Sequence, residues 1–161
     1  MKQMSEQEAL LRLTSLCSTA EHCSHEMLEK MRRWEIDEDA QTRIMEYLVK
    51  EKYIDDERYA RFFAKDKIRY NKWGRRKVEQ AMWQKHIDTD IQQRVLDDVD
   101  EEEYLAILRP LLKSKRKAVK ASSDYEMNMK LIRFAMGRGF TMDVIRQCLD
   151  NDDYDEIDDE D

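Results

Sequence analysis

The chain contains few of the residues that form tight turns, with 3 glycines and 1 proline among its 161 residues. Sheet proteins place such residues between strands at short intervals, so their scarcity argues against a sheet and favours helices joined by short connections. Apolar residues recur at helical spacing from about residue 9 to residue 149. Together these features predict an all-α fold.

Long apolar runs are also lacking. No stretch approaches the roughly 18 apolar residues that cross a bilayer, and the N-terminal MKQMSEQEAL lacks the apolar core of a signal peptide. The cysteines, Cys17, Cys23 and Cys148, are odd in number, which favours reduced thiols over a set of disulfides. We therefore expect a cytoplasmic protein that makes no membrane contact.

Sequence motifs for catalysis or metal binding are missing as well. The chain has no G-x-x-x-x-G-K-[ST] phosphate loop, no G-x-S-x-G turn and no H-E-x-x-H motif. Cys17, His22, Cys23 and His25 lie close together, but they lack the two separated ligand pairs of a structural zinc site. We expect neither an enzyme nor a bound cofactor or metal.

The net charge of −7 comes from one end of the chain. Residues 150–161, DNDDYDEIDDED, hold nine acids and no base, and without them the chain has 29 bases and 27 acids. Because like charges repel and this segment has little to bury, we expect a disordered acidic tail over 151–161. It is either a solubilising end or a mobile mimic of DNA that screens basic residues or competes for a partner's DNA-binding surface.

Short oxygen-bearing side chains mark the predicted helix starts, since they can accept a hydrogen bond from a first-turn amide. They are Ser24, Asp37, Asp55 or Asp56, Thr89, Ser122 or Ser123, and Thr141. Three of these starts follow similar turns, WEID, KHID and RGFT, which end at residues 37, 88 and 141. The intervals of 51 and 53 residues indicate an internal repeat.

The repeat predicts three tandem three-helix units over 6–54, 55–99 and 100–150. Because each unit is too small to be comfortably stable alone, we expect neighbours to pack into an elongated, curved body. We expect the apolar side of the helix before each turn to come from Leu28 with Met31, Val78 with Met82, and Leu131 with Met136. At Pro110 we expect a kinked helix rather than two helices.

The middle of the chain resembles the central module of the RecX regulatory proteins, in the run YIDDERYARFFAKDKIRYNKWGRRKVEQAMWQKHID of residues 53–88. The family signature apolar-Asp-Asp-x-Arg-aromatic-Ala is matched by Ile54, Asp55, Asp56, Arg58, Tyr59 and Ala60, and a later Gly-x-x-Arg/Lys-apolar stretch by Gly74, Lys77 and Val78. The run LIRFAMGRGFTMDVIRQCL is similar to the family's last module. Two departures are Trp34-Glu35, where the family usually has glycine, and the acidic tail.

RecX proteins bind the filament that a RecA-type recombinase forms on single-stranded DNA. The resemblance implies that this chain binds such a filament and restrains its ATPase and strand exchange, in homologous recombination, DNA repair and the SOS response. We expect a monomer that contacts the filament and single-stranded DNA, and duplex DNA only weakly.

A basic stripe supports this expectation from the residues alone. Arg58, Arg61, Lys65, Arg69 and Lys72 fall within about 80° of one helical face, and Trp73, Arg75, Arg76 and Lys77 follow them. Residues 58–86 hold ten bases and two acids. Because these bases repel one another unless an anion lies opposite, we predict a filament-binding or nucleic-acid-binding surface. The alternative is a solvated helix face.

Further predictions concern neighbouring residues. A second basic cluster could extend the surface, and it contains Lys113, Lys115, Arg116, Lys117 and Lys120. Helical spacing predicts a core position for Tyr59, Phe62, Phe63 and Tyr70 and pairs Asp66 with an arginine from a neighbouring unit. Trp73 either stacks on a base or a partner, or covers the end of a hydrophobic cluster.

Two other functions compete with filament regulation. Three-helix units resemble helix-turn-helix folds, so a DNA-binding regulator is one alternative. The third helices begin DEDAQ, TDIQQ and TMDV, however, and their acidic first turns would repel phosphates. The other alternative is a helical protein–protein scaffold without DNA contact, and the basic stripe argues against it.

Overall fold

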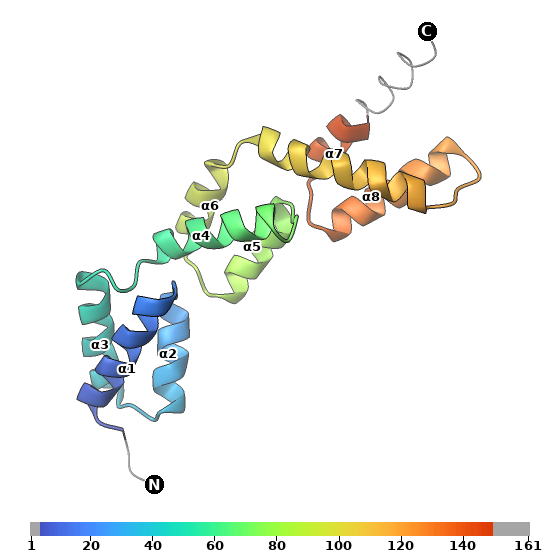
Figure 1. The fold of residues 1–161 in the computed structure, drawn as a ribbon. Coiled ribbons are helices and arrows are strands. Elements are labelled where there is room, and N and C mark those ends of the chain that lie inside the picture. The colour runs from blue at the N-terminus through green and yellow to red at the C-terminus, as the bar shows by residue number, and fades with distance from the viewer. Residues whose placement is uncertain (1–3, 150–161) are drawn as a thin grey trace. The chain divides into compact units, whose positions relative to one another are not determined.

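The computed structural model describes residues 4–149, and these residues form helices and no strand (Figure 1). The helices are α1 (Glu6–Thr19), α2 (Ser24–Arg33), α3 (Glu38–Lys50), α4 (Asp56–Arg69), α5 (Arg75–Gln84), α6 (Thr89–Asp97), α7 (Glu101–Ala118), α8 (Asp124–Gly137) and a last helix over 142–149. This order confirms the all-α prediction and the three successive sets of three helices. The predicted acidic tail over 151–161 lies outside the described residues.

The turn that revealed the repeat has the same hydrogen bonds in all three sets of helices. The amides of Ile36, Ile87 and Phe140 donate to the carbonyl oxygens five residues earlier, at distances of 3.0, 3.1 and 3.1 Å. These bonds close the end of the second helix of each set and turn the chain into the third. The apolar residue in each turn is buried, so the sequence pattern reflects both a backbone turn and a core position.

The residue before each of these apolar positions has a left-handed backbone. The φ angles are 56° at Glu35, 56° at His86 and 92° at Gly139. Only glycine adopts this region without a steric cost. Glu35 therefore adopts the left-handed conformation at this helix end despite its side chain, whereas glycine would adopt it more easily.

The helices start at or next to the predicted capping residues. Asp37 and Ser123 are the N-terminal caps of α3 and α8, as predicted. The hydroxyl of Thr141 accepts a hydrogen bond from the amide of Val144 at 3.5 Å. The prediction that Ser24 caps α2 is wrong, because the helix begins one residue earlier than expected: Ser24 is its first residue and Cys23 is the cap.

The described chain divides into two compact units. Unit 1 contains residues 4–63 and 82–95, and unit 2 contains residues 64–81 and 96–149. Helix α4 begins in unit 1 and ends in unit 2, whereas α5 begins in unit 2 and ends in unit 1.

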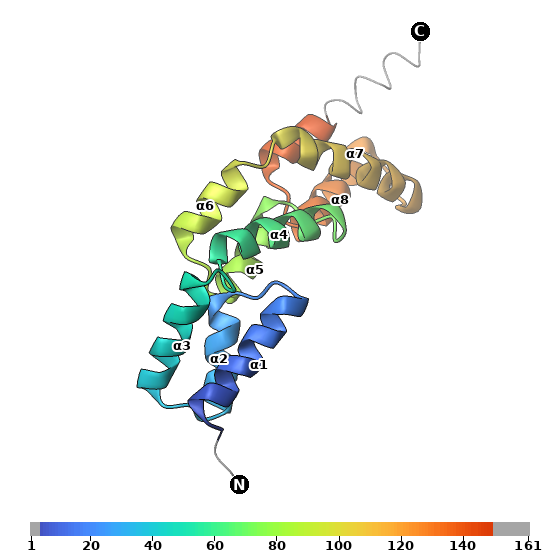
Figure 2. The ribbon, with the colours of Figure 1, turned by 60° about the vertical axis from the view of Figure 1, so that its left-hand side comes forward.

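Unit 1 holds its first three helices around one apolar core (Figure 2). Leu13 of α1, Met27 of α2 and Leu48 of α3 are fully buried in it. An ion pair at the rim recurs with the repeat: Arg43 contacts Glu6 at 2.9 Å, and Arg94 contacts Glu57 at 2.5 Å. Each member of the second pair lies 51 residues after its counterpart, so the repeat extends from the turns to the surface.

The same kind of junction links successive sets of helices in each unit. In unit 1 the thiol of Cys23 donates to the carbonyl oxygen of Lys85 at 3.8 Å. In unit 2 the amide of Gly74 donates to the carbonyl oxygen of Arg138 at 2.9 Å. Gly74 lies 51 residues after Cys23, and Arg138 lies 53 residues after Lys85. The loop before a second helix thus packs on the following set's turn.

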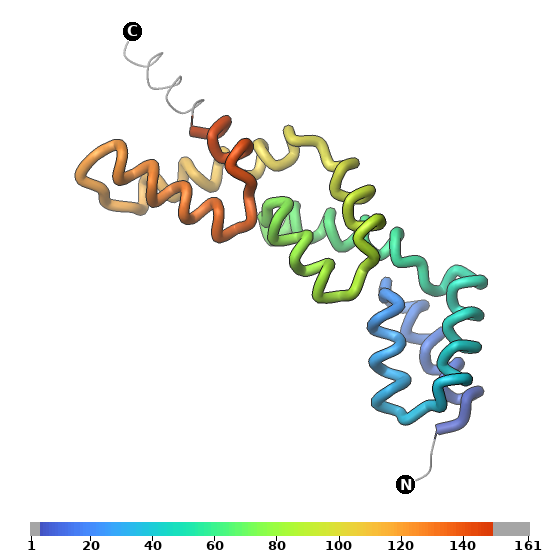
Figure 3. The backbone as a smooth tube through the Cα atoms, turned by 180° about the vertical axis from the view of Figure 1, so that it is seen from behind, coloured from blue at the N-terminus to red at the C-terminus, as the bar shows by residue number. Residues whose placement is uncertain are grey.

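Unit 2 contains an antiparallel pair of helices, α7 and α8, which lie side by side in the view from behind (Figure 3). Helix α7 is continuous although Pro110 lies inside it, so the alternative of two separate helices is wrong. Tyr104, Leu105, Leu108 and Leu112 form its buried side.

Several predicted core residues are exposed. Phe62 and Tyr70 are 64% and 81% exposed, because α4 buries a narrow stripe of Ala60, Ala64 and Ile68 instead. The helix uses small residues at its closest contacts, and its larger aromatics lie outside this stripe.

Two other side chains differ from the prediction. Asp66 is also exposed and lies 3.8 Å from Lys67, not beside an arginine of another unit. Met136 is 48% exposed, and Ala135 takes the core position before the third turn.

Candidate nucleic-acid interface

The outward face of α4 carries the predicted basic residues together with an exposed aromatic ring. Arg61, Lys65 and Arg69 are exposed at spacings of four residues, which places them near one face of the helix. Phe62 lies three residues before Lys65 and seven before Arg69, so its exposed ring borders the same face. Cationic groups beside an exposed aromatic ring are typical of single-strand binding surfaces.

Arg58 belongs to the predicted stripe but is engaged inside unit 1. Its guanidinium donates to the carboxylate of Glu21 at 2.8 Å and to the carbonyl oxygens of Lys52 and Tyr53 at 3.1 and 3.3 Å. These contacts connect the start of α4 to the loop after α1 and to the loop after α3. Arg58, the arginine of the family signature, therefore stabilises the packing within unit 1.

Two other bases of α4 form exposed ion pairs. Arg61 lies 3.8 Å from Glu57, and Arg69 lies 3.4 Å from Glu103 of α7. Exposed pairs of this kind contribute about 0–1 kcal/mol each, so a stronger anion can compete for both guanidinium groups. Within the described part of the chain, Lys65 has no ion pair.

The loop between α4 and α5 surrounds Trp73 with positive charge. The ammonium groups of Lys67 and Lys77 lie 5.5 and 4.8 Å from the centre of its ring, within the range of a cation–π contact. Lys72, with a left-handed φ of 58°, directs the backbone into this loop. Trp73 is half-buried. The two lysines therefore cover part of the ring for which stacking on a base or a partner was one predicted role.

The first turn of α5 separates its bases into two environments. Arg75 is half-buried and donates to the carboxylate of Asp97 at 2.7 Å. Arg76 is exposed, and its amide donates to the carbonyl oxygen of Gly139 at 2.9 Å. The backbone of Arg76 thus fixes the junction while its side chain lies at the surface.

Arg138 joins the two basic clusters that the sequence places far apart. Its guanidinium donates to the carbonyl oxygen of Asn71 at 3.3 Å and lies 5.3 Å from the ring centre of Phe134. The ammonium group of Lys115 lies 4.9 Å from the same ring. A continuous path therefore leads from the α4–α5 loop to the end of α7.

We call these groups the basic surface of unit 2. It comprises Lys65, Lys67, Arg69, Lys72, Trp73, Lys77, Lys115, Phe134 and Arg138. The neighbouring Lys113, Lys117 and Lys120 are exposed and Arg116 is half-buried. Sequence reasoning missed Arg138 and Phe134, because neither belongs to a basic run and Arg138 meets Asn71 across 67 residues of chain.

Two further properties concern other kinds of site. Among the described residues there is no group of three or more His, Cys, Asp and Glu side chains that could hold a metal ion. None of the helices over residues 4–149 is both long enough and apolar enough to span a membrane.

Comparisons with known proteins identify the family. The sequence pattern of the second three-helix domain of RecX matches residues 55–96, and that of the third three-helix domain matches residues 101–149. The chain belongs to the RecX family. Both matched segments lie within the second and third sets of helices, which carry the residues of the basic surface.

Relatives of known name support the same family. The chain is 28% identical over 137 residues to the regulatory protein RecX of Acinetobacter baylyi, which covers 84% of this chain and 82% of that protein. It is 28% identical over 115 residues to the regulatory protein RecX of Clostridium botulinum, which covers 70% of this chain. The chain spans 53% of the length of that clostridial relative.

Solved structures of RecX proteins have the same fold. The crystal structure of RecX from Lactobacillus salivarius matches with a TM-score of 0.88 at 18% identity, over 92% of this chain and 97% of that one. A crystal structure of a regulatory protein RecX matches with a TM-score of 0.82 at 18% identity, over 90% of this chain and 73% of that one. The chain thus has the sequence pattern of the RecX family and the fold of solved RecX structures.

Proposed function

We propose that this protein binds the filament of a RecA-type recombinase on single-stranded DNA and restrains its ATPase and strand-exchange activity. Membership of the RecX family suggests the recombinase as the partner. The observation that carries the proposal is the basic surface of unit 2, where the two basic clusters of the sequence meet through Arg138 and Phe134.

The chemistry of this surface suits a filament that presents phosphates. Lysine and arginine side chains release counterions when they neutralise phosphates, which favours binding at low salt. The exposed ring of Phe62 on α4 could stack on an unpaired base. Acidic patches on recombinase subunits would meet the same cations.

Duplex readout by a recognition helix is the weaker alternative. The third helix of the first set begins with Glu38 and Asp39, and that of the second set contains Asp90 in its first turn. The last helix carries Asp143 near its start. These carboxylates would face the phosphates of a duplex if such a helix entered the major groove.

Charge reversal on α4 tests the proposal. We expect the triple variant Arg61→Glu, Lys65→Glu and Arg69→Glu to lose most of its binding to a recombinase filament assembled on single-stranded DNA. Helicity and melting should change little, because exposed charges contribute about 0–1 kcal/mol each. Fluorescence anisotropy of the labelled protein, titrated with filament, measures the binding.

A control variant separates local from overall charge effects. Arg32, Arg33 and Lys50 are exposed bases on α2 and α3, and reversing them to glutamate changes the net charge by the same amount. The control should weaken filament binding far less than the α4 variant. Equal losses in the two variants would show that net charge, not the exposed bases of α4, governs binding.

A further inference from the structure

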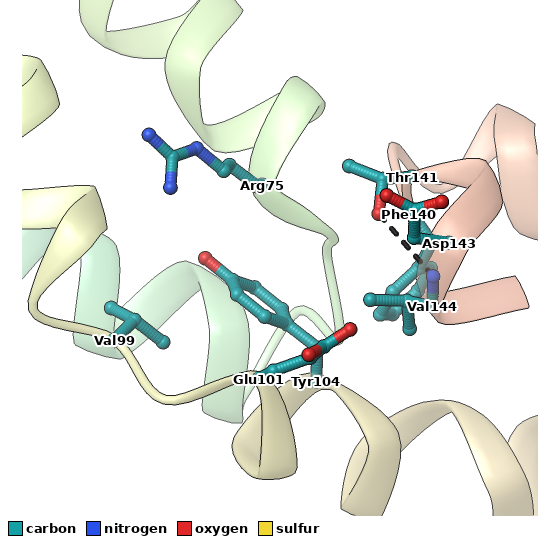
Figure 4. Close-up of a pocket in the computed structure, with 8 residues that line it drawn as sticks. All are labelled: Arg75, Val99, Glu101, Tyr104, Phe140, Thr141, Asp143 and Val144. Atoms are coloured by element: carbon teal, nitrogen blue, oxygen red, sulfur yellow. Dashed lines mark hydrogen bonds between the residues drawn. The ribbon is translucent and has the colours of Figure 1, made fainter. Parts of the chain in front are cut away.

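Unit 2 contains a second potential binding site, apart from the basic surface. It is a cavity of about 200 Å³ between the start of α5, the start of α7 and the turn before the last helix (Figure 4). Arg75, Glu101, Tyr104, Thr141 and Asp143 contribute its polar groups. Ligand pockets for drug-sized molecules occupy about 300–1,000 Å³, so this cavity suits a single side chain.

The hydroxyl group of Tyr104 is the feature that points to a ligand. The side chain is 5% exposed, and its hydroxyl has no hydrogen-bond partner among the described residues. Burial raises the pKa of Tyr104 to about 12, so the phenol is neutral and can accept or donate a hydrogen bond. A buried polar group without a partner is unfavourable, and a ligand in the cavity could satisfy it.

Two carboxylates give the cavity its charge. Glu101 lies in the first turn of α7, and Asp143 lies near the start of the last helix. Acids at these positions are expected from the helix dipole alone, so they indicate a ligand only in combination with the unpartnered Tyr104. Asp143 is exposed, whereas Glu101 also accepts a hydrogen bond from the side-chain amide of Gln147.

The one base in the lining does not neutralise these acids. The guanidinium of Arg75 donates to Asp97 at 2.7 Å. In Figure 4 it lies across the cavity from both Glu101 and Asp143, near the hydroxyl end of Tyr104. The acids on the other side are therefore available to a cation from outside.

We propose that this cavity binds an arginine side chain of a partner protein. A planar guanidinium in the cavity can donate one N–H to the hydroxyl oxygen of Tyr104 and others to the carboxylates of Asp143 and Glu101. Nucleic acid is excluded as the occupant, because these carboxylates repel phosphates. The inference rests on the proposed function for the identity of the partner, which is the recombinase subunit of the filament.

A small probe tests the cavity without the recombinase. Nα-acetyl-arginine methylamide is titrated into the isotopically labelled full chain, and two-dimensional NMR follows the methyl groups of Val99 and Val144, which line the cavity. The neutral isostere Nα-acetyl-citrulline methylamide serves as the ligand control. We expect saturable shifts with the arginine probe and much smaller shifts with citrulline.

Two variants connect the shifts to the named groups. Asp143→Asn should weaken binding of the arginine probe about tenfold, the usual effect of one charge-assisted hydrogen bond. Tyr104→Phe should weaken it several-fold, although removing an unpartnered hydroxyl leaves the fold intact. Asp39→Asn, which removes an exposed first-turn acid of α3, should have no effect. Equal shifts with both probes, or equal losses in the Asp39 and Asp143 variants, would overturn the arginine site.

Filament binding separates this inference from the proposed function. The Asp143→Asn variant should bind the recombinase filament several-fold more weakly than the unmodified chain. If that variant loses the arginine probe but binds the filament normally, the recombinase is not the source of the arginine. If the unmodified chain does not bind the filament at all, the proposed function itself fails while the probe result stands.

Discussion

Replacing Gly74 with alanine should destabilise the junction that positions the basic surface. A Cβ atom on residue 74 would lie 2.3 Å from the amide nitrogen of Phe140 and 2.5 Å from the carbonyl carbon of Gly139. Both neighbours are backbone atoms, so no side chain can rotate away. The loop and the turn must therefore separate.

The cost follows from the contacts that this separation breaks. The amides of Gly74 and Arg76 donate to the carbonyl oxygens of Arg138 and Gly139, both at 2.9 Å. Each hydrogen bond contributes about 0.5–1.5 kcal/mol net, and overpacking a close contact costs about 1–3 kcal/mol. We expect Gly74→Ala to lower the free energy of unfolding by about 2–6 kcal/mol.

Gly137 provides a control with the opposite sign. It is the last residue of α8, and a Cβ atom there would meet nothing within 4 Å. Alanine is favoured over glycine in a helix by about 0.5–1 kcal/mol, so Gly137→Ala should leave stability unchanged or raise it slightly. Urea unfolding followed by circular dichroism, with the slope m fitted for each variant, measures both changes.

The comparison can refute the reasoning in two ways. A Gly74→Ala variant that unfolds at the same urea concentration as the unmodified chain would mean that the junction is not closed in solution. A loss of stability as large in Gly137→Ala would mean that added bulk near this turn, rather than the contact of residue 74 with Phe140, is responsible.

Three further outcomes are expected. Hydrogen bonds from Ser122 and Lys130 hold the pKa of Glu126 at about 2, below its ordinary 4.5. The ionised carboxylate therefore stabilises α8 fully above pH 4.5, and this stabilisation is lost as the pH falls towards 2. Between these pH values the melting temperature of Glu126→Gln should change less with pH than that of the unmodified chain. Burial raises the pKa of Cys23 to about 11, so iodoacetamide at pH 8 should label this fully buried thiol at a rate limited by unfolding, as mass spectrometry of timed digests would show. Deleting residues 151–161, which hold eight acids, should tighten binding to naked single strands several-fold at low salt and less at high salt, whereas equal affinities would favour a solubilising tail.

The turns of the repeat could be predicted because they combine a backbone requirement with a core position. Ile36, Ile87 and Phe140 each end a hydrogen-bonded turn and enter the core. The pattern of one apolar residue followed by a capping residue was therefore sufficient to locate all three turns. The left-handed φ angles of Glu35 and His86 could not be read from their residue types, since neither is glycine.

The faces of α4 were predicted in part. Helical spacing placed the basic residues together, but it does not indicate how closely a neighbouring helix approaches. Because α4 packs through Ala60, Ala64 and Ile68, the exposed face is wide enough to include Phe62 and Tyr70. The exposure of these two rings depends on the small size of the residues through which α4 packs, and helical periodicity does not predict that packing.

The composition of the candidate site also required tertiary structure. Runs of bases in the sequence marked α4, the α4–α5 loop and the end of α7, but the path between them passes through Arg138 and Phe134. Arg58, which looked like part of the stripe, contacts Glu21 and two backbone carbonyls instead. Ion pairs and cation–π contacts between distant segments decide such roles, and local sequence does not contain them.

The DNA-dependent ATPase of a RecA-type recombinase tests the central claim most directly. Rates are measured on single-stranded DNA with rising amounts of this protein and of the Arg61→Glu, Lys65→Glu, Arg69→Glu variant. We predict that the unmodified protein lowers the rate at amounts comparable to or below that of the recombinase, and that the variant does so only weakly. An unchanged rate at saturating unmodified protein, with no filament binding detected, would contradict the proposed function.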